Sequence, residues 1–352
     1  MGDTHDIGTR KHDHLRLTAG GEVEFRHRTT LLEGVHLVHQ ALPELAEHDL
    51  DLSIVLAGRR LRAPLVIASM TGGIPEAAAI NRDLARAAEH FGLAFGVGSM
   101  RALLRRPEAL ASYAVRDVAP TAMILANLGV VQARQLRSQE VRELCDRLGA
   151  DALCVHVNPA MELVQDGGDR DFRGALATID RLENELGLPV VVKETGCGLS
   201  RRAAAALAAA GVHTVDVGGA GGTSWVGVEA MRAQEPAARA TGDALWDWGV
   251  PTAASVVYCV EAGLEAVATG GIRDGLDVAR ALALGARAAG MAAPLLRAQQ
   301  QGGLESVVTA LEGVLRTLRT VMLLCGCRTP GGLAVAPRVV TGDLRHWLEP
   351  GG

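Results

Sequence analysis

The stretch ATGGIRDGLDVARALALGA, residues 268–286, has the pattern of a strand, a glycine turn and a helix in succession. An apolar run over 264–268 leads into Gly270 and Gly271, and an amphipathic segment begins after Arg273. Adjacent glycines let a ligand approach the backbone, because no Cβ is in the way. The start of a helix offers free N–H groups that suit a phosphate. The stretch therefore predicts a βα unit with a phosphate site, although a tight turn that binds nothing has the same pattern.

The same alternation of short apolar runs with alanine-rich amphipathic segments continues along the chain from residue 63. The runs cover 63–69, 94–98, 122–126, 152–157, 189–192, 214–217, 264–268 and 288–292. They lack apolar/polar alternation, which is typical of parallel strands covered on both faces. Eight such units favour an α/β fold of the (β/α)8 TIM-barrel type, although an open doubly wound sheet has the same alternation.

Composition and charge narrow the class of protein. Only 3% of the 352 residues are aromatic while 48% are hydrophobic, which suits layered α/β packing. A net charge of −5 without long runs of one sign indicates no nucleic-acid partner, and no apolar stretch is long enough for a membrane span. The polar N-terminus does not resemble a secretory signal, and six cysteines without a CxxC pair predict buried thiols in a reducing compartment. We therefore expect a cytoplasmic protein.

Two segments lie outside the repeating pattern. Residues 1–62 are predicted to form an N-terminal arm and extension, and residues 63–352 the barrel. The cluster RKHDH at 10–14 is either a solvated arm or an arm that folds over the barrel mouth and supplies cations to an anion. The segment 225–254 is long for one βα connection and holds three of the four tryptophans, so we expect either an interface or an insertion at the mouth.

Nearly every apolar run ends in polar or glycine residues. In a barrel these ends meet at the carboxyl-terminal face, where active sites lie. One such residue could be a helix cap, but eight coincidences are less expected than one shared site. The ends include Ser69, Met70, Thr71, Gly72, Ser99, Arg101, Asn127, His156, Asn158, Lys193, Glu194, the loop 218–223, Gly270, Gly271, Arg273, Ala292 and Ala293.

A flavin mononucleotide fits this arrangement. Its phosphate would lie at the glycine-rich loops 218–223 and 270–273, with the ring over the mouth. Lys193 follows the fifth run, where a lysine would stabilise an anionic reduced flavin. The alternative for Lys193 is an ion pair with Glu194 or with another barrel carboxylate.

The segment HVNPAMELVQDGGDRDFRG, residues 156–174, carries further candidates. His156 and Asn158 alternate along a strand, so both can face the mouth. Glu162 could hold Mg²⁺ if phosphates and waters complete the octahedron, or could simply be a carboxylate favoured by a helix dipole. Residues 169–173 look like a structural ion network. The chain has no Ser-His-Asp order and no HExxH motif.

Taken together, these motifs resemble the family of type 2, FMN-dependent isopentenyl-diphosphate delta-isomerases. The resemblance covers nearly the whole chain in order. It rests on RKHDH at 10–14, MTGG at 70–73, GVGS-x-R at 96–101, ANLG at 126–129, HVNP at 156–159, GDRDFRG at 168–174, VKE-x-G at 192–196, VDVGGAGGTSW at 215–225, WGVPTAAS at 248–255 and GGIRDGLDVA at 270–279.

The resemblance implies a role for each matching position. It implies that FMN, reduced by NADPH, acts on a prenyl diphosphate in a homo-oligomer, either a tetramer or an octamer. The residues implied to bind FMN are Ser69, Met70, Thr71, Gly72, Ser99, Asn127, Lys193, Thr223, Gly270, Gly271, Arg273, Ala292 and Ala293. Substrate would contact Arg10, Lys11, Ser99, Arg101 and Met161, Glu162 would bind Mg²⁺, and His156, Asn158 and Lys193 would be catalytic.

Two positions depart from the family pattern. Met161 and Met100 stand where the family usually has glutamine. Each change replaces an amide with an apolar, polarizable side chain of similar volume. Neutral drift around an unchanged isomerase is one interpretation. The alternatives are a relative that protonates, and then cyclises or isomerises, a longer prenyl diphosphate, and a flavin-binding protein without activity.

Overall fold

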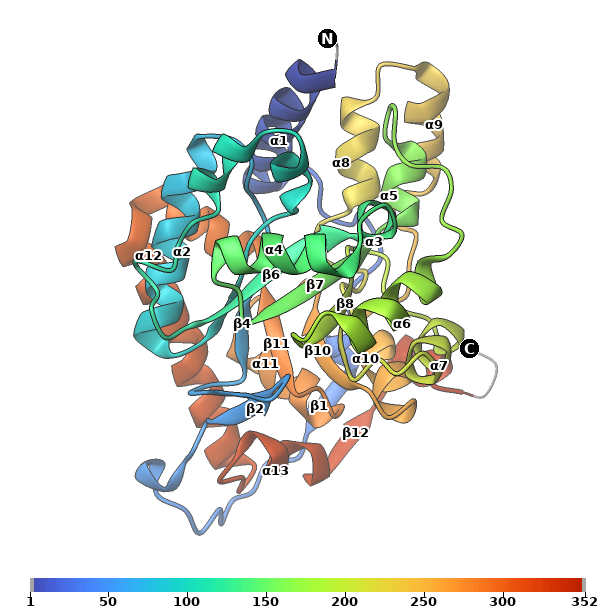
Figure 1. The fold of residues 1–352 in the computed structure, drawn as a ribbon. Coiled ribbons are helices and arrows are strands. Elements are labelled where there is room, and N and C mark those ends of the chain that lie inside the picture. The colour runs from blue at the N-terminus through green and yellow to red at the C-terminus, as the bar shows by residue number, and fades with distance from the viewer. Residues whose placement is uncertain (1–2, 350–352) are drawn as a thin grey trace.

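The computed structural model describes residues 3–349 and contains a closed barrel of eight parallel strands (Figure 1). The (β/α)8 prediction is thereby confirmed. Each strand pairs with its neighbours in chain order, and the last pairs with the first. The strands are β4 (Leu65–Ile67), β5 (Ala94–Gly96), β6 (Met123–Gly129), β7 (Ala152–Val157), β8 (Val190–Glu194), β9 (Thr214–Asp216), β10 (Glu265–Thr269) and β11 (Ala288–Met291).

The strand boundaries differ from the apolar runs at their carboxyl ends. Strand β6 continues three residues beyond the predicted end at 126, and β8 continues two beyond 192. The ladder explains this difference, because Gly129 still pairs with His156 and Val157 with Glu194. Polar residues that the sequence placed after the strands are therefore held by sheet hydrogen bonds.

Helices surround the barrel, and several end where a glycine permits it. Gly92 and Gly149 follow α2 and α4 with φ of 64°, the left-handed conformation that commonly ends a helix. The long α12 is kinked at Gly302 and Gly303. The outer helices are α2 (Glu76–Phe91), α4 (Ser138–Leu148), α6 (Ala175–Glu185), α7 (Arg201–Ala209), α10 (Thr252–Glu261), α11 (Gly275–Ala283) and α12 (Ala293–Leu324).

Side-chain alternation along the strands decides which residues face the barrel interior. Cys154 and Val191 belong to a buried cluster inside the barrel, whereas Val192 packs in the larger cluster between the strands and the helices. Because strand residues two apart share a face, His156 and Lys193 also point inward, one layer nearer the mouth. The carboxyl-terminal layer of the interior is thus polar.

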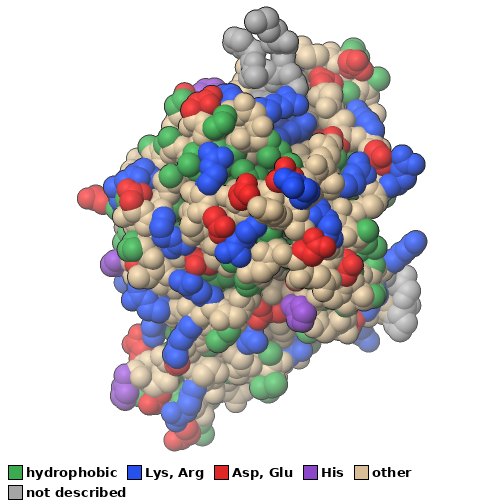
Figure 2. Space-filling view, in the orientation of Figure 1, with side chains coloured by type: hydrophobic (Ala, Val, Ile, Leu, Met, Phe, Trp, Pro, Cys, Tyr) green, Lys and Arg blue, Asp and Glu red, His purple; other side chains and the backbone are tan. Residues whose placement is uncertain are grey.

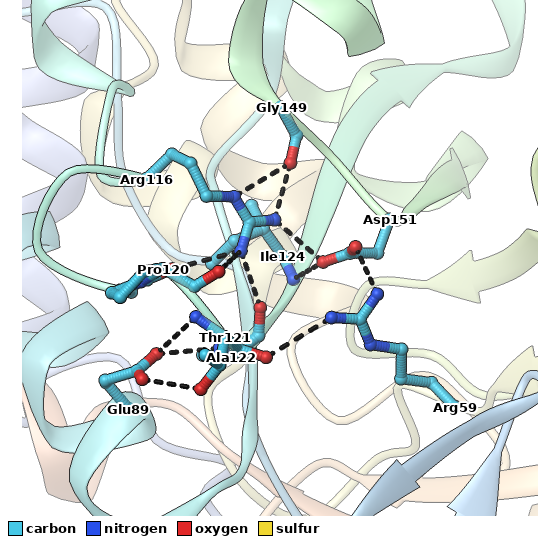
Figure 3. A network of polar contacts seen from close by, with 10 residues as sticks. Arg59, Glu89, Arg116, Pro120, Thr121, Ala122, Ile124, Gly149 and Asp151 are labelled. Atoms are coloured by element: carbon cyan, nitrogen blue, oxygen red, sulfur yellow. Dashed lines mark hydrogen bonds and ion pairs between the residues drawn. The ribbon is translucent and has the colours of Figure 1, made fainter.

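The opposite end of the barrel is closed by a hairpin of β2 (Ile54–Leu56) and β3 (Arg59–Leu61) and by a polar network (Figure 3). Asp151 accepts hydrogen bonds from Arg116, from Arg59 and from the N–H of Ile124, at 2.7–2.8 Å. The guanidinium of Arg116 also donates to nearby backbone carbonyls. One carboxylate therefore fixes the starts of β6 and β7 and the hairpin.

The segments outside the barrel lie mainly around its mouth and at its base. Helix α1 (Asp3–Gly20) lies beside α8 (Trp225–Arg232), which in turn packs against α9 (Pro236–Ala244) (Figure 1). Strand β1 (Val35–Leu37) pairs antiparallel with β12 (Arg338–Val340). The remaining short helices are α3 (Val130–Arg134), α5 (Pro159–Val164), α13 (Pro330–Val335) and α14 (Gly342–Trp347). No helix among the described residues is long and apolar enough to cross a membrane.

The cysteine prediction is confirmed where the structure tests it. All six cysteines are free thiols, and five of them are buried, including Cys325 and Cys327. Figure 2 shows acidic and basic side chains interspersed on the face in view. This mixture is in keeping with the absence of single-sign runs in the sequence.

Candidate active site

A cavity at the barrel mouth brings most of the predicted site residues together. Strand ends form its floor, and α1 contributes the side chains that cover it. Residues 10–14 lie within helix α1, and Arg10, Lys11 and His14 line the cavity. The predicted residues that line the cavity are Arg10, Lys11, Ser69, Met70, Thr71, Ser99, Arg101, Asn127, His156, Asn158, Met161, Glu162, Lys193, Thr223, Gly270, Gly271, Arg273, Ala292 and Ala293.

Gly72 and Met100, both singled out in the sequence, do not line this cavity. Gly72 packs against Tyr113, so closely that a Cβ would lie 2.0 Å from the ring. Met100 is fully buried in the core between barrel and helices. Of the two positions that depart from the family pattern, only Met161 therefore lines the cavity.

The two glycine-rich loops pack directly on each other beneath the cavity. A Cβ on Gly222 would lie 2.4 Å from the nitrogen of Gly271, and one on Gly270 would lie 2.1 Å from the carbonyl oxygen of Gly219. Gly270 and Gly271 also have positive φ values, of 110° and 73°. These glycines are thus required by the close contact between loops as well as by any ligand above them.

At the start of α11, where a phosphate is expected, two of the helix N–H groups already have a partner. Asp274 caps this helix by accepting hydrogen bonds from the N–H groups of Leu276 and Asp277, both at 2.9 Å. Arg273 lies at the cavity edge but pairs with Asp277 at 2.8 Å. The start of α12, by contrast, has no side-chain cap at Ala292 and lines the cavity. The first turn of α12 has few N–H groups to offer, because Pro294 has none and those of Leu295 and Leu296 donate to the carbonyl oxygen of Ala292.

Several buried polar atoms at the cavity have no hydrogen-bond partner. They are the hydroxyls of Thr18, Thr71 and Thr269 and Nε of Arg10. An unpaired buried polar group costs free energy, about 1–3 kcal/mol for each. Such atoms around one cavity indicate a polar ligand that satisfies them.

Cationic side chains gather on the α1 side of the cavity. Nζ of Lys11 donates to the carbonyl oxygen of Ser99 at 3.4 Å. Burial, together with the positive charges of Arg10 and Arg106, lowers the pKa of Lys11 to about 7. Burial also lowers the pKa of Arg10. The charged forms of Arg10 and Lys11 are thus disfavoured in the free protein. An anion with several negative charges would stabilise them, so we interpret this side of the cavity as an anion site.

His156 is a neutral imidazole at the cavity floor. Burial, with the positive charges of Lys11 and Lys193, lowers its pKa to about 3. Its Nδ1 lies 2.7 Å from Oδ1 of Asn127, so Nδ1–H donates to this amide oxygen. The bond fixes the orientation of the ring and leaves Nε2 without a proton.

Glu162 is a buried carboxylate that faces the cavity from α5. Its Oε1 accepts a hydrogen bond from Nδ2 of Asn158 at 3.1 Å, and its Oε2 accepts one from the N–H of Asp169 at 2.8 Å. Nδ2 of Asn158 also lies 3.6 Å from Sδ of Met161. Among the described residues, no three His, Cys, Asp or Glu side chains gather as a metal site. A metal here would have to take most of its ligands from substrate and water.

The predicted ion network at 169–173 divides into two parts. Asp171 pairs with Arg173 at 2.8 Å and with Arg134 at 3.7 Å, and this part is exposed and structural. Asp169 instead lies 3.9 Å from Arg101 and accepts a hydrogen bond from Gln132. Asp169 thus supports the rim of the cavity.

Lys193 forms the structural ion pair that the sequence left open as an alternative. Its Nζ lies 2.8 Å from Oδ2 of Asp216, and both side chains are buried. The partner is not Glu194, whose Oε2 accepts backbone N–H groups from Gly196 and Gly198. Lys193 nevertheless lines the cavity, so it is both paired and available to a ligand.

Helix α1 is attached to α8 by a buried polar chain. His14 donates from Nε2 to Oε1 of Glu229 at 2.6 Å, and Arg232 joins Oε2 of the same carboxylate to Asp13. Although burial opposes it, these contacts lower the pKa of Glu229. The segment 225–254 is thus an insertion at the mouth, and its Trp225 lines the cavity.

No role was predicted from the sequence for three residues at or beside the cavity. Thr269 lines the floor, His14 lines the cavity and joins α1 to α8, and Asp216 lies outside the lining and holds Lys193. Strand alternation could have indicated Asp216, which lies one position before the end of the run 214–217 and two after Thr214. Nothing in the local pattern around His14 indicates a contact 215 residues away.

Comparison with known proteins places the chain among flavin enzymes. It matches the model of the FMN-dependent dehydrogenase family over residues 5–171 and 158–336. The isopentenyl-diphosphate delta-isomerase of Methanosarcina mazei is 45% identical over 347 residues, covering 97% of this chain and 94% of that protein. The isomerase of the same name from Synechococcus sp. is 49% identical over 315 residues, covering 88% of this chain and 90% of that protein.

Solved structures agree with the fold. A mandelate oxidase variant superimposes with a TM-score of 0.66 at 20% identity, covering 96% of this chain and all of that chain (100%). A second structure of the same variant, determined with the monooxide FMN adduct, gives a TM-score of 0.65 at 19% identity, covering 97% of each chain. At such identity the likeness concerns the barrel alone.

Proposed function

Because the chain belongs to the FMN-dependent dehydrogenase family and, within it, to the isopentenyl-diphosphate delta-isomerases, we propose that it interconverts isopentenyl diphosphate and dimethylallyl diphosphate. The proposed reaction uses reduced FMN and Mg²⁺, with NADPH as the source of electrons. The observation that carries the proposal is the cavity itself. Cations on α1 face a floor that holds Lys193, His156 and two glycine-rich loops.

The residues of the floor fit FMN. The phosphate would lie on the backbone of Gly270, Gly271, Ala292 and Ala293, where side chains are small or absent. The unpaired hydroxyls of Thr71 and Thr269 suit the polar atoms of the cofactor. Lys193 would lie near the pole of the ring that becomes negative on reduction. When bound and reduced, FMN supplies the acid and base that add a proton to the substrate and remove one.

The other side of the cavity fits a diphosphate and one Mg²⁺. The positive charges of Arg10, Lys11 and Arg101 would bind the phosphate oxygens. The negative charge of the diphosphate would in turn favour the protonated form of Lys11, which burial and neighbouring cations disfavour in the free protein. Glu162 would be the single side-chain ligand of Mg²⁺. This ion usually keeps several water ligands and takes phosphate oxygens as others. Asn158 and the N–H of Asp169 orient the carboxylate for this role.

The remaining task of the chain is to orient the substrate and exclude water. The neutral His156, fixed by Asn127, offers an uncharged polar edge beside the alkene. Helix α1 covers the bound substrate, with Leu15 and Trp225 as apolar walls. We also expect the homo-oligomer implied by the resemblance, either a tetramer or an octamer.

The decisive test uses the reduced holoprotein with isopentenyl diphosphate in D₂O. We expect dimethylallyl diphosphate and deuterium in both isomers, detected by NMR. If FMN and Mg²⁺ are bound but neither product nor deuterium uptake occurs, the proposed reaction is wrong. Geranyl and geranylgeranyl diphosphates should then be offered to the same protein, to separate a longer substrate from an inactive flavoprotein.

Lys11 predicts a pH dependence of substrate capture. With a pKa of about 7 in the free protein, Lys11 is charged below pH 7 and loses its charge as the pH rises above it. We therefore expect kcat/KM for isopentenyl diphosphate to fall above pH 7. The variant Lys11→Arg should keep kcat/KM flat between pH 7 and 9, because arginine stays charged. An unchanged fall in this variant would assign the dependence to another group.

Met161 is the one observation that favours a second candidate function, the conversion of a longer prenyl diphosphate. It lines the cavity and places a thioether against Asn158, where an amide would offer hydrogen bonds. If Met161 has only drifted, Met161→Gln should change isomerase kcat/KM less than about threefold. If it marks a different substrate, this variant should gain isomerase activity tenfold or more and lose turnover of the longer diphosphate. Met161→Leu, which keeps an apolar side chain of similar volume at the same position, is the matched control for packing effects.

A further inference from the structure

The buried pair of Lys193 and Asp216 has a property that the proposed reaction does not use. The two residues are register partners on β8 and β9, and their charged atoms lie 2.8 Å apart. The side chains are only 8% and 7% exposed. A buried pair of this kind is costly to break, because the charge left behind has no solvent to compensate it.

The second oxygen of Asp216 ties the pair to the flavin-side loop. Oδ1 accepts a hydrogen bond from the N–H of Gly218 at 3.1 Å. Gly218 begins the loop 218–223 with a φ of 47°, and a Cβ at this position would clash with the carbonyl oxygen of Glu194. One carboxylate therefore fixes both the lysine and the first residue of the loop.

Among the groups around Lys193, Asp216 is the carboxylate that serves as its counter-ion. Glu194, the neighbouring acid on β8, is turned away and is held by three backbone N–H groups. Cys154, on β7, is a neutral thiol, since burial and the charge of Asp216 raise its pKa to about 12. On the neighbouring strand β7, His156 is the register partner of Lys193 and is neutral. The charge of Lys193 is therefore shared between Asp216 and any ligand above it.

We propose that Asp216 is a positioning residue that sets how strongly Lys193 stabilises reduced FMN. The inference rests on the proposed binding of FMN at this floor. An anionic reduced flavin must compete with Asp216 for the lysine, whereas neutral oxidised flavin does not compete. Asp216 thus moderates the preference of the site for the reduced cofactor while holding Lys193 in place.

The test measures the midpoint potential of FMN bound to the wild-type, Asp216→Asn and Lys193→Met holoproteins. We expect Asp216→Asn to raise the ratio of the dissociation constants of oxidised and reduced FMN about tenfold, which makes the potential about 30 mV less negative. Lys193→Met should shift the potential the other way. The proposal would be overturned if Asp216→Asn changed the ratio of dissociation constants less than twofold. It would also be overturned if Asp216→Asn and Lys193→Met moved the midpoint potential in the same direction.

Two controls separate this inference from loss of structure and from failure of the proposed reaction. Asp151→Asn removes a charge from the network at the opposite end of the barrel, so it should lower stability without moving the potential. The D₂O assay on the same wild-type holoprotein reports the isomerase separately. A holoprotein that binds FMN and shows the opposed shifts supports the inference even without isomerase activity. A chain that binds no FMN contradicts both.

Discussion

Replacing Glu162 with glutamine will lower kcat/KM for isopentenyl diphosphate at least 100-fold, a loss of about 2.7 kcal/mol in transition-state stabilisation. The substitution removes the charge proposed to hold Mg²⁺. In the wild-type chain both carboxylate oxygens accept hydrogen bonds, one from Asn158 and one from the N–H of Asp169. The glutamine replaces one of these oxygens with an NH₂ group, which cannot accept and would face a donor. Side-chain volume is unchanged, so the fold should persist. Steady-state rates over a titration of Mg²⁺ measure the effect.

The matched control is Asp171→Asn, an exposed carboxylate on the same segment that pairs with Arg173 and not with the cavity. It should keep the wild-type rate and the wild-type dependence on Mg²⁺. If Glu162→Gln also keeps that dependence, the metal is bound elsewhere or the reaction does not need it. FMN binding, followed by absorbance, should remain normal in both variants, which separates the metal site from the flavin site.

Replacing Glu229 with alanine will raise KM for isopentenyl diphosphate by about 10–100-fold with a smaller change in FMN affinity. Glu229 is only 1% exposed and accepts hydrogen bonds from His14 and Arg232. Such charge-assisted bonds are worth about 1.5–3 kcal/mol each, and their loss weakens the contact of α1 with α8. Since α1 carries Arg10 and Lys11, the diphosphate loses its cations.

Hydrogen exchange provides the direct measurement for this variant. Amides of α1 should exchange faster in Glu229→Ala, while those of the barrel strands should not change. Glu235→Ala, an exposed glutamate at the start of α9, is the control and should leave both KM and exchange unchanged. Faster exchange throughout the barrel would mean that Glu229 supports the whole fold and not α1 in particular.

The barrel could be predicted from sequence because its signal is local. Each apolar run and each amphipathic segment reports its own structure, and a (β/α)8 barrel pairs strands in chain order. The ends of the strands were less visible, since Asn127 and Lys193 are polar and yet remain in the sheet. Helix α1 was missed as a helix because its charged sequence has little apolar periodicity, and its contacts come from residues more than 200 positions away.

Most of the candidate site could be predicted for a different reason. Strand ends of a barrel meet at one face whatever their separation in sequence, so residues as distant as Ser69 and Ala293 were correctly grouped. What sequence could not supply was the partner of each polar group. Lys193 pairs across the sheet with Asp216 and not with adjacent Glu194, and Asp274 occupies the helix start that a phosphate was expected to use.

The alternation of side chains along β8 also limits how this enzyme can change during evolution. Val191 and Lys193 face the interior while Val192 packs outside. Deleting one residue within the strand would reverse both faces, placing Val192 under the cavity and a lysine among the helices. The strands can therefore accept substitutions at interior positions without loss of register. Insertions and deletions are expected only in the loops, where they do not shift the strand register. New substrate preferences in this lineage should arise by point changes such as that at Met161, and new loop lengths should be found only beyond the strand ends.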